Sequence, residues 1–265
     1  MLGLLGVNAA ILIVLVLILW GVSVAIKDVS FIDAFWGVGM ALLAIASWLH
    51  VRGGPSELAT LIMAMTVLWG FRLGIYLFFR WRREGEDRRY RRILKDAREQ
   101  GRFASHALTR VWLMQAVLLF AVSSPAQVGI LASPHPAEIT PLAWGGFALW
   151  CVGIFFEWVG DWQLARFKAD PANKGHVLDT GLWRYTRHPN YFGDFCVWWG
   201  IWLTSAAAGW EYAAATVIGP IFLSFTLTRW SGVPLLERGL HRSKGNKYAV
   251  YERKTSAFFP WPPVY

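Results

Sequence analysis

Long apolar blocks separated by short polar segments run through most of the chain. The first block, from Leu4 to Ile26, contains no charged residue. As a helix that rises about 1.5 Å per residue, it is long enough to cross about 30 Å of hydrocarbon. It lacks the basic start, short apolar core and small-residue cleavage site of a signal peptide. We therefore interpret it as a retained membrane helix.

The same pattern recurs six more times along the chain. It predicts an all-α, polytopic membrane protein, a bundle of seven transmembrane helices over residues 4–26, 31–50, 58–80, 108–130, 141–163, 190–208 and 212–231. No soluble domain of useful size remains outside these spans. The whole chain, residues 1–265, is therefore expected to form a single membrane domain.

Basic residues are unevenly distributed over the predicted loops. They gather after the third span, after the fifth span and in the carboxyl-terminal tail, whereas residues 131–140 and 209–211 contain no Lys or Arg. Cytoplasmic loops of membrane proteins carry the excess of positive charge. We therefore expect the N-terminus to lie outside and the C-terminus to lie in the cytoplasm.

The composition agrees with this interpretation and argues against several kinds of partner and site. Hydrophobic residues make up 55% of the chain, its mean hydropathy is +0.38, and its net charge is +9. Because the basic residues lie between apolar spans, membrane topology accounts for most of the excess, and no nucleic-acid partner is expected. Cys151 and Cys196 lie inside apolar spans and match no metal-ligand spacing, so neither a metal site nor a disulfide framework is predicted.

Several ionisable residues fall where the lipid should be. They lie within predicted spans or within a turn of their ends: Asp33, Arg72, Glu157, Asp161, Asp194 and Arg229. A charge at membrane depth costs about 2.5–3.5 kcal/mol on insertion scales and usually faces the interior of a bundle. Two interpretations are open. The six residues form a buried ion-pair network that only holds helices together, or they line a polar cavity that binds an anionic ligand.

The segment GLWRYTRHPNYFGD, residues 181–194, is the most informative in the chain. Pro189 suits the first turn of a helix, so we expect a membrane helix to begin there. Asn190 and Asp194, four residues apart on one face, suit an adenine edge or ribose hydroxyls. The helix amino terminus and the basic residues at its cytoplasmic mouth favour phosphate: Arg184, Arg187 and His188. In the alternative interpretation the arginines are topology signals and the proline is only a helix start.

This segment resembles the carboxy-terminal signature of membrane steroid and sterol reductases, Arg-His-Pro-Asn-Tyr-x-Gly-Asp. The tail PLLERGLHRSKGNKYAVYERKTSAFFPWPPVY is similar to theirs, and GDWQLARFK (160–168) resembles the segment before the signature in steroid 5α-reductases. The resemblance covers residues 157–265 well and is looser over 1–130. It implies a bacterial, NADPH-dependent reductase of the 3-oxo-5α-steroid 4-dehydrogenase type in the inner membrane, with its active site open to the cytoplasm.

The resemblance also implies which residues bind NADPH. The matching positions of the later spans and the tail are Asp161, Lys168, Asn190, Asp194, Tyr248 and Tyr251. Two further positions are similar to the family's phosphate-binding arginines on the third and seventh spans, Arg72 and Arg229. On this basis residues 131–265 hold the cofactor and residues 1–130 shape the substrate pocket. The chain has no Gly-x-Gly-x-x-Gly after a strand, so a Rossmann domain is not the cofactor site.

Enone reduction needs a hydride at the β-carbon and an acid that hydrogen-bonds the carbonyl oxygen. In steroid 5α-reductases a glutamate on the second span and a tyrosine on the third supply the polarising groups. Here the second span offers only the carboxylate of Asp33, and the tyrosine position is Trp69. We expect Asp33, kept protonated by burial, to polarise the carbonyl, with Tyr76 as the second candidate and Trp36 and Trp69 in the substrate pocket. Alternatively, Asp33 is a helix cap or an ion-pair partner.

Two other functional classes compete. Membrane methyltransferases that act on isoprenylated cysteine or phospholipids carry a similar Arg-His-Pro-x-Tyr-x-Gly motif and bind S-adenosylmethionine with it. These methyltransferases usually have two adjacent glutamates downstream of the motif. Here only one of the two is present, because Glu237 follows Leu236. Asp194, directly after Gly193, favours the reductase. A transporter or lipid-binding bundle would predict discontinuous helices in two matching halves, and none are evident. The expected partners are a small apolar substrate and membrane lipids, without a protein partner.

Overall fold

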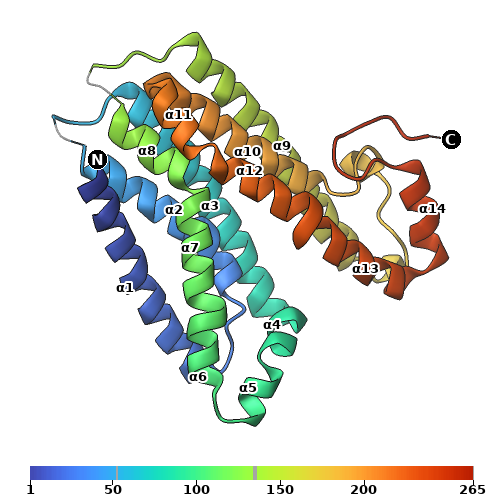
Figure 1. Ribbon diagram of the computed structural model, residues 1–265. Helices are drawn as coiled ribbons and strands as arrows, with labels where there is room; N and C mark the ends of the chain where they lie inside the picture. The colour runs from blue at the N-terminus through green and yellow to red at the C-terminus, as the bar shows by residue number, and fades with distance from the viewer. Residues whose placement is uncertain (52, 134–135, 265) are drawn as a thin grey trace. The chain divides into compact units, whose positions relative to one another are not determined.

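The computed structural model describes residues 1–51, 53–133 and 136–264, and the regular structure in these ranges is entirely helical (Figure 1). The α-helices are α1 (Leu2–Ile26), α2 (Ile32–Leu49), α3 (Glu57–Glu84), α4 (Arg88–Ile93), α5 (Lys95–Glu99), α6 (Phe103–His106), α7 (Leu113–Val122), α8 (Ser124–Ala132), α9 (Pro141–Ala169), α10 (Pro189–Ser205), α11 (Trp210–Thr216), α12 (Ile218–Phe225), α13 (Val233–Lys244) and α14 (Asn246–Lys254). Shorter turns are η1 (Ala107–Trp112) and η5 (Thr226–Trp230), both π-helical, and the 3-10 turns η2 (Pro171–Asn173), η3 (Gly181–Arg184) and η4 (Ala206–Ala208). The expected all-α class is confirmed.

Among the residues that the structure describes, six helical segments are long and apolar enough to cross a membrane: Leu2–Ile26, Ile32–Leu49, Glu57–Glu84, Phe103–Val122, Pro141–Ala169 and Trp210–Lys244. The chain is therefore a multi-pass membrane protein. The predicted span 190–208 forms α10, which at 17 residues is not among these six. The predicted span 108–130 differs from the structure, because the helix ends at Val122 and α8 starts anew with Pro125 in its first turn, where no backbone donor is needed.

The chain divides into two compact units. Unit 1 contains Met1–Ala143 and Thr204–Gly219, and unit 2 contains Trp144–Leu203 and Pro220–Tyr265. Unit 1 therefore holds the expected carboxylate of the second span, whereas unit 2 holds the signature segment and the tail.

Glycines let α2 and α3 pack backbone to backbone in unit 1, where Figure 1 shows them side by side. A Cβ atom added at Gly37 would overlap the carbonyl oxygen of Gly70, and one added at Gly70 would overlap that of Gly37. Lipid tails are as apolar as leucine, so membrane helices associate through such close van der Waals contacts between small residues.

A buried polar network joins three helices of unit 1. The Asn8 amide of α1 donates hydrogen bonds to Ser47 Oγ of α2 at 2.7 Å and to Gln127 Oε1 of α8 at 2.9 Å. Gln127 Nε2 in turn donates to Ser123 Oγ at 2.8 Å. All four side chains are buried, so each polar group needs a partner inside the protein. This requirement sets which face of α1 points inward.

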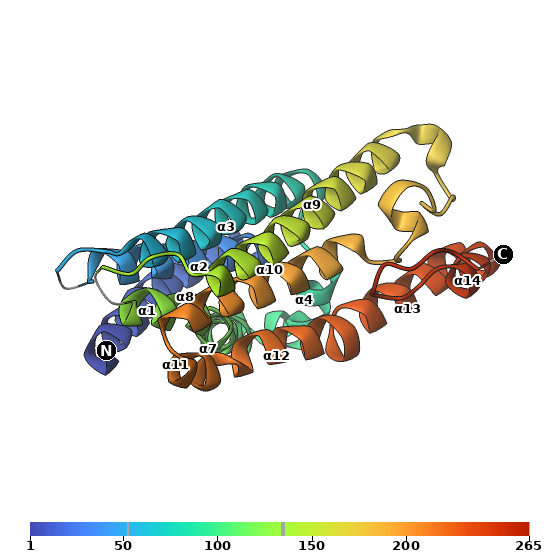
Figure 2. The same ribbon diagram turned by 90° about the horizontal axis from the view of Figure 1, so that it is seen from above.

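Glycines also bring α9 and α10 together in unit 2, and Figure 2 shows these helices running alongside each other. A Cβ atom at Gly193 would lie 2.6 Å from the carbonyl oxygen of Gly153, and one at Gly200 would lie 2.7 Å from that of Gly146. Gly193 therefore permits the close approach of a neighbouring helix. The same packing brings the start of α10 against the carboxylates of α9.

Candidate functional site

Two buried carboxylates of α9 form the base of the candidate site in unit 2. Glu157 and Asp161 are 2% and 4% exposed, and both face inward from an apolar helix. The Asn190 amide donates a hydrogen bond to Asp161 Oδ1 at 3.1 Å. Since α10 begins at Pro189, Asn190 lies in its first turn, as the sequence predicted. Two of the predicted cofactor residues are thus brought together at a helix amino terminus.

Hydrogen bonds to α9, to α14 and to the tail hold the signature segment in place before α10 begins. Trp183 Nε1 donates to the carbonyl oxygen of Gly160 in α9 at 3.1 Å. The hydroxyl of Tyr251 in α14 donates to the carbonyl oxygen of Trp183 at 2.5 Å. Thr186 Oγ1 donates to the carbonyl oxygen of Phe258 in the tail at 2.8 Å. The backbone that precedes α10 is therefore fixed before any ligand binds.

Arg187 is buried and connects the signature to the tail. Its Nε donates to Glu237 Oε1 at 2.8 Å, and its Nη1 donates to the carbonyl oxygens of Glu252 at 3.0 Å and Thr255 at 2.7 Å. Burial by itself would lower the pKa of Arg187, but the hydrogen bonds and charge of Glu237 outweigh it, and the pKa rises. The guanidinium is therefore a permanent charge with most of its donors engaged by the protein.

His188 shares the carboxylate of Glu237. Its Nε2 lies 3.0 Å from Glu237 Oε1, and its ring stacks on Tyr191 with ring centroids 5.4 Å apart. Because Nε2 faces a carboxylate, it carries the proton. Nδ1 is buried and has no hydrogen-bond partner among the residues that the structure describes. A buried ring nitrogen in this state is suited to a polar atom of a ligand or to a water molecule.

The two tyrosines predicted in the tail lie on α14 and pack against each other, with ring centroids 5.9 Å apart. Tyr248 is 1% exposed and Tyr251 is 7% exposed, and burial, reinforced by neighbouring negative groups, raises the pKa of both phenols. Both hydroxyls therefore keep their protons at neutral pH. The hydroxyl of Tyr248 makes no hydrogen bond within the described ranges, whereas that of Tyr251 is occupied by Trp183.

The other predicted cofactor residues of unit 2 lie at different depths. Asp194 is half-buried in α10, one turn beyond Asn190. Three basic residues are exposed, at the end of α9, in η3 and in η5: Lys168, Arg184 and Arg229. Unit 2 thus contains a buried, hydrogen-bonded polar centre together with exposed basic side chains.

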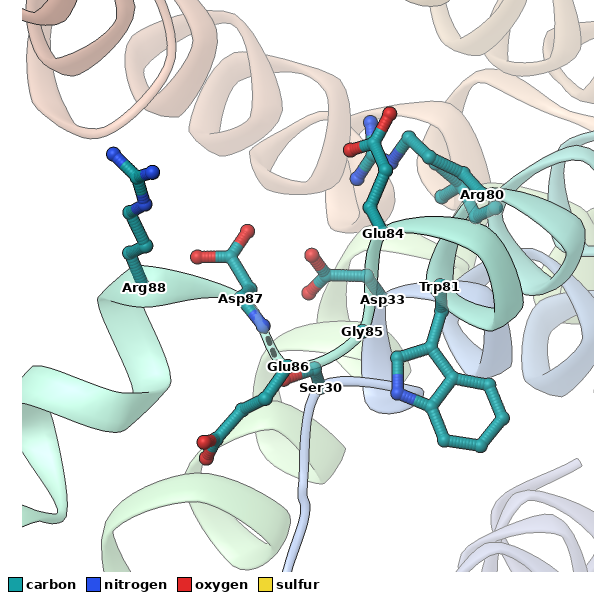
Figure 3. A pocket seen from close by; sticks show the side chains of 10 residues that line it. Ser30, Asp33, Arg80, Trp81, Glu84, Gly85, Glu86, Asp87 and Arg88 are labelled. Carbon is teal, nitrogen blue, oxygen red and sulfur yellow. Dashed lines mark hydrogen bonds between the residues drawn. The ribbon is translucent and has the colours of Figure 1, made fainter.

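Unit 1 holds a second polar site around Asp33, in the first turn of α2. Asp33 Oδ1 accepts a hydrogen bond from the Tyr90 hydroxyl at 2.6 Å, and Oδ2 accepts one from Arg89 Nη2 at 2.7 Å. Figure 3 shows Asp33 turned toward Asp87, and Arg89 Nη2 reaches both carboxylates. Asp33 and Asp87 border a cavity of about 410 Å³ that is lined largely by charged residues, among them Arg80, Glu84 and Arg88.

The hydrogen bonds around Asp33 extend inward along a chain of side chains. Gln115 Nε2 lies 3.5 Å from the Tyr90 hydroxyl, and Trp36 Nε1 donates to Gln115 Oε1 at 2.5 Å. Burial and the charge of Asp33 raise the pKa of the Tyr90 phenol well above its ordinary value, so the phenol stays protonated. The ion pair with Arg89 agrees with the interpretation of Asp33 as an ion-pair partner, and its role as the polarising acid stays a prediction.

A family model described as "Protein of unknown function (DUF1295)" matches residues 19–255. The chain belongs to the DUF1295 family. DUF1295 includes steroid 5α-reductase-like membrane proteins. The match covers both units and therefore both polar sites.

Relatives of this DUF1295 protein carry little functional information. An uncharacterized protein of Schizosaccharomyces pombe, C594.04c, is 25% identical over 273 residues, which cover 92% of this chain and 76% of that protein. The probable O-methyltransferase ustE of Ustilaginoidea virens is 37% identical over 78 residues, which cover 29% of this chain and 25% of that protein. No solved structure matches.

In this DUF1295 chain, the remaining predicted residues of unit 1 lie on α2 and α3. Trp69 is 2% exposed, and Trp36 is the start of the hydrogen-bond chain to Asp33. Arg72 lies over the ring of Tyr76 at 5.3 Å, one turn further along the same helix. The roles predicted for these four residues stay predictions.

Sequence reasoning missed Arg89, Tyr90 and Gln115, which contact Asp33 or continue its hydrogen bonds. The first two belong to a run of arginines that topology alone explains, and Gln115 lies in an apolar span. The only available signal was that a tyrosine and a glutamine are unusual in those surroundings. Their separations from the Asp33 site, 57 residues for Tyr90, are beyond the reach of helical periodicity.

Proposed function

We propose that this DUF1295 protein is a membrane-embedded reductase that uses NADPH to reduce the C=C bond of an enone. The observation that carries the proposal is the partly buried contact between Asp161 and Asn190 in unit 2. A carboxylate and an amide held 3.1 Å apart at a helix amino terminus offer the acceptors and donors that ribose hydroxyls and an adenine edge require. Exposed Lys168 and Arg184 supply positive charge for phosphates.

The residues present fit such a cofactor. Nδ1 of His188 and the hydroxyl of Tyr248 are buried polar atoms without partners among the described residues, and both are suited to ligand atoms. Asp161, Asn190 and Asp194 would hold the nucleoside part. The phosphates would bind the exposed basic residues of unit 2, which include the family's arginine position on the seventh span: Lys168, Arg184 and Arg229. NADPH, when bound, supplies the hydride.

The polarising acid is assigned to the Asp33 site. The Tyr90 phenol keeps its proton because its pKa is raised, and it donates that proton in a hydrogen bond to the Asp33 carboxylate at 2.6 Å; in this proposal the phenol turns from Asp33 to hydrogen-bond the carbonyl oxygen when a substrate binds. Tyr76 is the second candidate. The substrate class, a 3-oxo-Δ4 steroid, comes from the resemblance of the signature segment, and Trp36 and Trp69 are proposed to contact its apolar body.

The proposal includes a membrane topology. It places seven helices across the bacterial inner membrane, with α10 as the span beyond the six longer ones, the N-terminus outside and the C-terminus in the cytoplasm. The distribution of Lys and Arg supports this orientation. In this topology the start of α10 and the tail face the cytoplasm, where NADPH is available.

Thermal stability of the purified protein in detergent tests the cofactor directly. NADPH is expected to raise the unfolding temperature, and NADH to raise it less. Asp194→Ala and Asn190→Leu are expected to weaken NADPH binding about tenfold or more, since each removes a polar contact to a buried ligand. Asp96→Ala, an exposed aspartate of α5, is the matched control. Equal NADPH affinity in wild type and both site variants would refute the assignment.

A second candidate function is methyl transfer from S-adenosylmethionine. The specific observation in its favour is the 37% identity over 78 residues to a protein named as a probable O-methyltransferase. The same titration separates the two functions. If S-adenosylmethionine stabilises the protein and NADPH does not, the reductase is wrong and the methyltransferase is supported. Loss of NADPH absorbance on addition of a 3-oxo-Δ4 steroid would then test the substrate class of the reductase.

A further inference from the structure

A cavity of about 670 Å³ in unit 2 lies beside the polar centre around Arg187, and Tyr251 and Thr255 border both. It is bordered by the segment before η3, by α14 and by the end of the tail. Its charged lining is mainly basic: Arg184, Lys247 and Lys254, with His176 beside them and Asp179 as the one acidic residue. Three cations against one anion give a net charge of +2 without His176. The cavity therefore favours an anionic group.

Hydrogen bonds that need no ligand hold the walls of this cavity. The backbone N–H of Val264 donates to the carbonyl oxygen of Lys254 at 3.0 Å, and the N–H of Trp261 donates to that of Tyr185 at 2.9 Å. The tail is thus tied to α14 on one side and to the end of η3 on the other. This arrangement is a preformed cleft, which lowers the entropic cost of binding.

The cleft is also partly apolar. Val177, Val250, Pro263 and Val264 line it together with the basic residues. The tail beside it exposes large apolar side chains, with Phe259 at 60%, Trp261 at 69% and Val264 at 67% exposure. Exposed tryptophan next to basic side chains is typical of protein surfaces at the headgroup level of a membrane. A water-soluble anion would use the charges but leave these apolar groups uncovered.

We infer that this cleft binds the headgroup phosphate of an anionic phospholipid, while the neighbouring tail side chains enter the interface of the same leaflet. The basic residues of α13 and α14 outside the cleft add to the attraction: Arg238, Arg242, Lys244 and Arg253. The inference does not depend on the proposed reductase. Arg184 and Tyr251 border the cleft as well as belonging to the predicted cofactor set, so the test must separate lipid from nucleotide.

Short-chain phosphatidylglycerol, titrated into the full-length protein in a neutral detergent, is the probe. We expect it to raise the unfolding temperature at concentrations where short-chain phosphatidylcholine has little effect. The double variant Lys247→Gln, Lys254→Gln is expected to bind phosphatidylglycerol about tenfold more weakly. Both lysines are exposed, and neither belongs to the predicted cofactor residues, so the variant should fold and keep its NADPH affinity.

The matched control is Arg238→Gln, Arg242→Gln, which removes the same charge from exposed positions of α13 outside the cleft. An equal loss of lipid affinity in this control would mean that charge acts diffusely and would overturn a defined site. An equal response to phosphatidylcholine would also overturn it. The same stabilisation by inorganic phosphate would exclude the lipid, and displacement of phosphatidylglycerol by NADPH would assign the cleft to the nucleotide.

Discussion

Arg187 had two possible roles in the sequence, a ligand for phosphate or a topology signal, and the structure gives it another. Its guanidinium connects the signature segment to Glu237 and to two backbone carbonyls of the tail. At 9% exposure it is largely removed from water, so these partners are needed to compensate for its desolvation. The residue thus holds the tail against the start of α10 and positions the neighbouring His188.

Replacing Arg187 should therefore destabilise the fold. Arg187→Gln leaves Glu237 and two carbonyl oxygens without their charged donor, and loss of one partner from a buried ion pair costs about 3–5 kcal/mol. Thermal unfolding of the detergent-solubilised variant measures the loss. Arg253→Gln, which removes an exposed arginine from α14, is the control and should change little. Equal unfolding temperatures for the two variants would contradict the structural role.

Tyr90 allows a second test at this scale. Tyr90→Phe removes a hydrogen bond to the Asp33 carboxylate, and hydrogen bonds to charged groups contribute about 1.5–3 kcal/mol. We expect lower stability and, if the pair polarises the carbonyl, a lower kcat with little change in NADPH affinity. Tyr212→Phe on α11 is the matched change. A variant with wild-type stability and wild-type turnover would show that the phenol has neither role.

At the scale of helices, small residues decide which surfaces meet. The hydrophobic effect provides no driving force for two apolar helices to associate in lipid, so the shape of the contact matters more than its hydrophobicity. In unit 1 the backbones of α2 and α3 touch at Gly37 and Gly70, and in unit 2 α9 and α10 touch at Gly153 and Gly193. The second contact also brings Asn190 to Asp161, the pair on which the proposed cofactor site rests.

Two glycine substitutions separate the effect of helix packing on stability from the effect of helix propensity. Gly37→Ala places a methyl group against the Gly70 carbonyl, and overpacking of this kind costs about 1–3 kcal/mol. Gly21→Ala in α1 meets nothing within 4 Å, and alanine is the better helix former by about 0.5–1 kcal/mol. Unfolding temperatures should therefore move in opposite directions. A shift of the same sign in both variants would contradict the close α2–α3 contact.

At the scale of the whole molecule, the prediction to test is the membrane topology. If the basic loops face the cytoplasm, Glu138 before α9 is outside and Arg253 of α14 is inside. In a background with Cys151 and Cys196 replaced by serine, a membrane-impermeant maleimide should label Glu138→Cys in intact cells. It should label Arg253→Cys only after the cells are opened. The reverse pattern would invert the topology and move the cofactor site away from the cytoplasm.

Local patterns in the sequence predicted much of what is local in the structure. The all-helical class, most of the membrane helices and the start of α10 at Pro189 follow from apolar periodicity and from the geometry of proline. The prediction failed at residues 108–130, where Ser123 and Pro125 interrupt a run that is apolar on both sides. Apolarity continues through such a break, so hydropathy alone could not locate it.

The sequence by itself determined that the chain crosses a membrane, where most of its helices run and that Glu157 and Asp161 are buried, because a hydrocarbon environment restricts each of these locally. Only the tertiary structure decided how those polar residues pair. Arg187 meets Glu237 across 50 residues, Asp161 meets Asn190 across 29, and Asp33 meets Tyr90 across 57. Any of several buried carboxylates could have satisfied a given donor, and the close packing of particular helices selected among them.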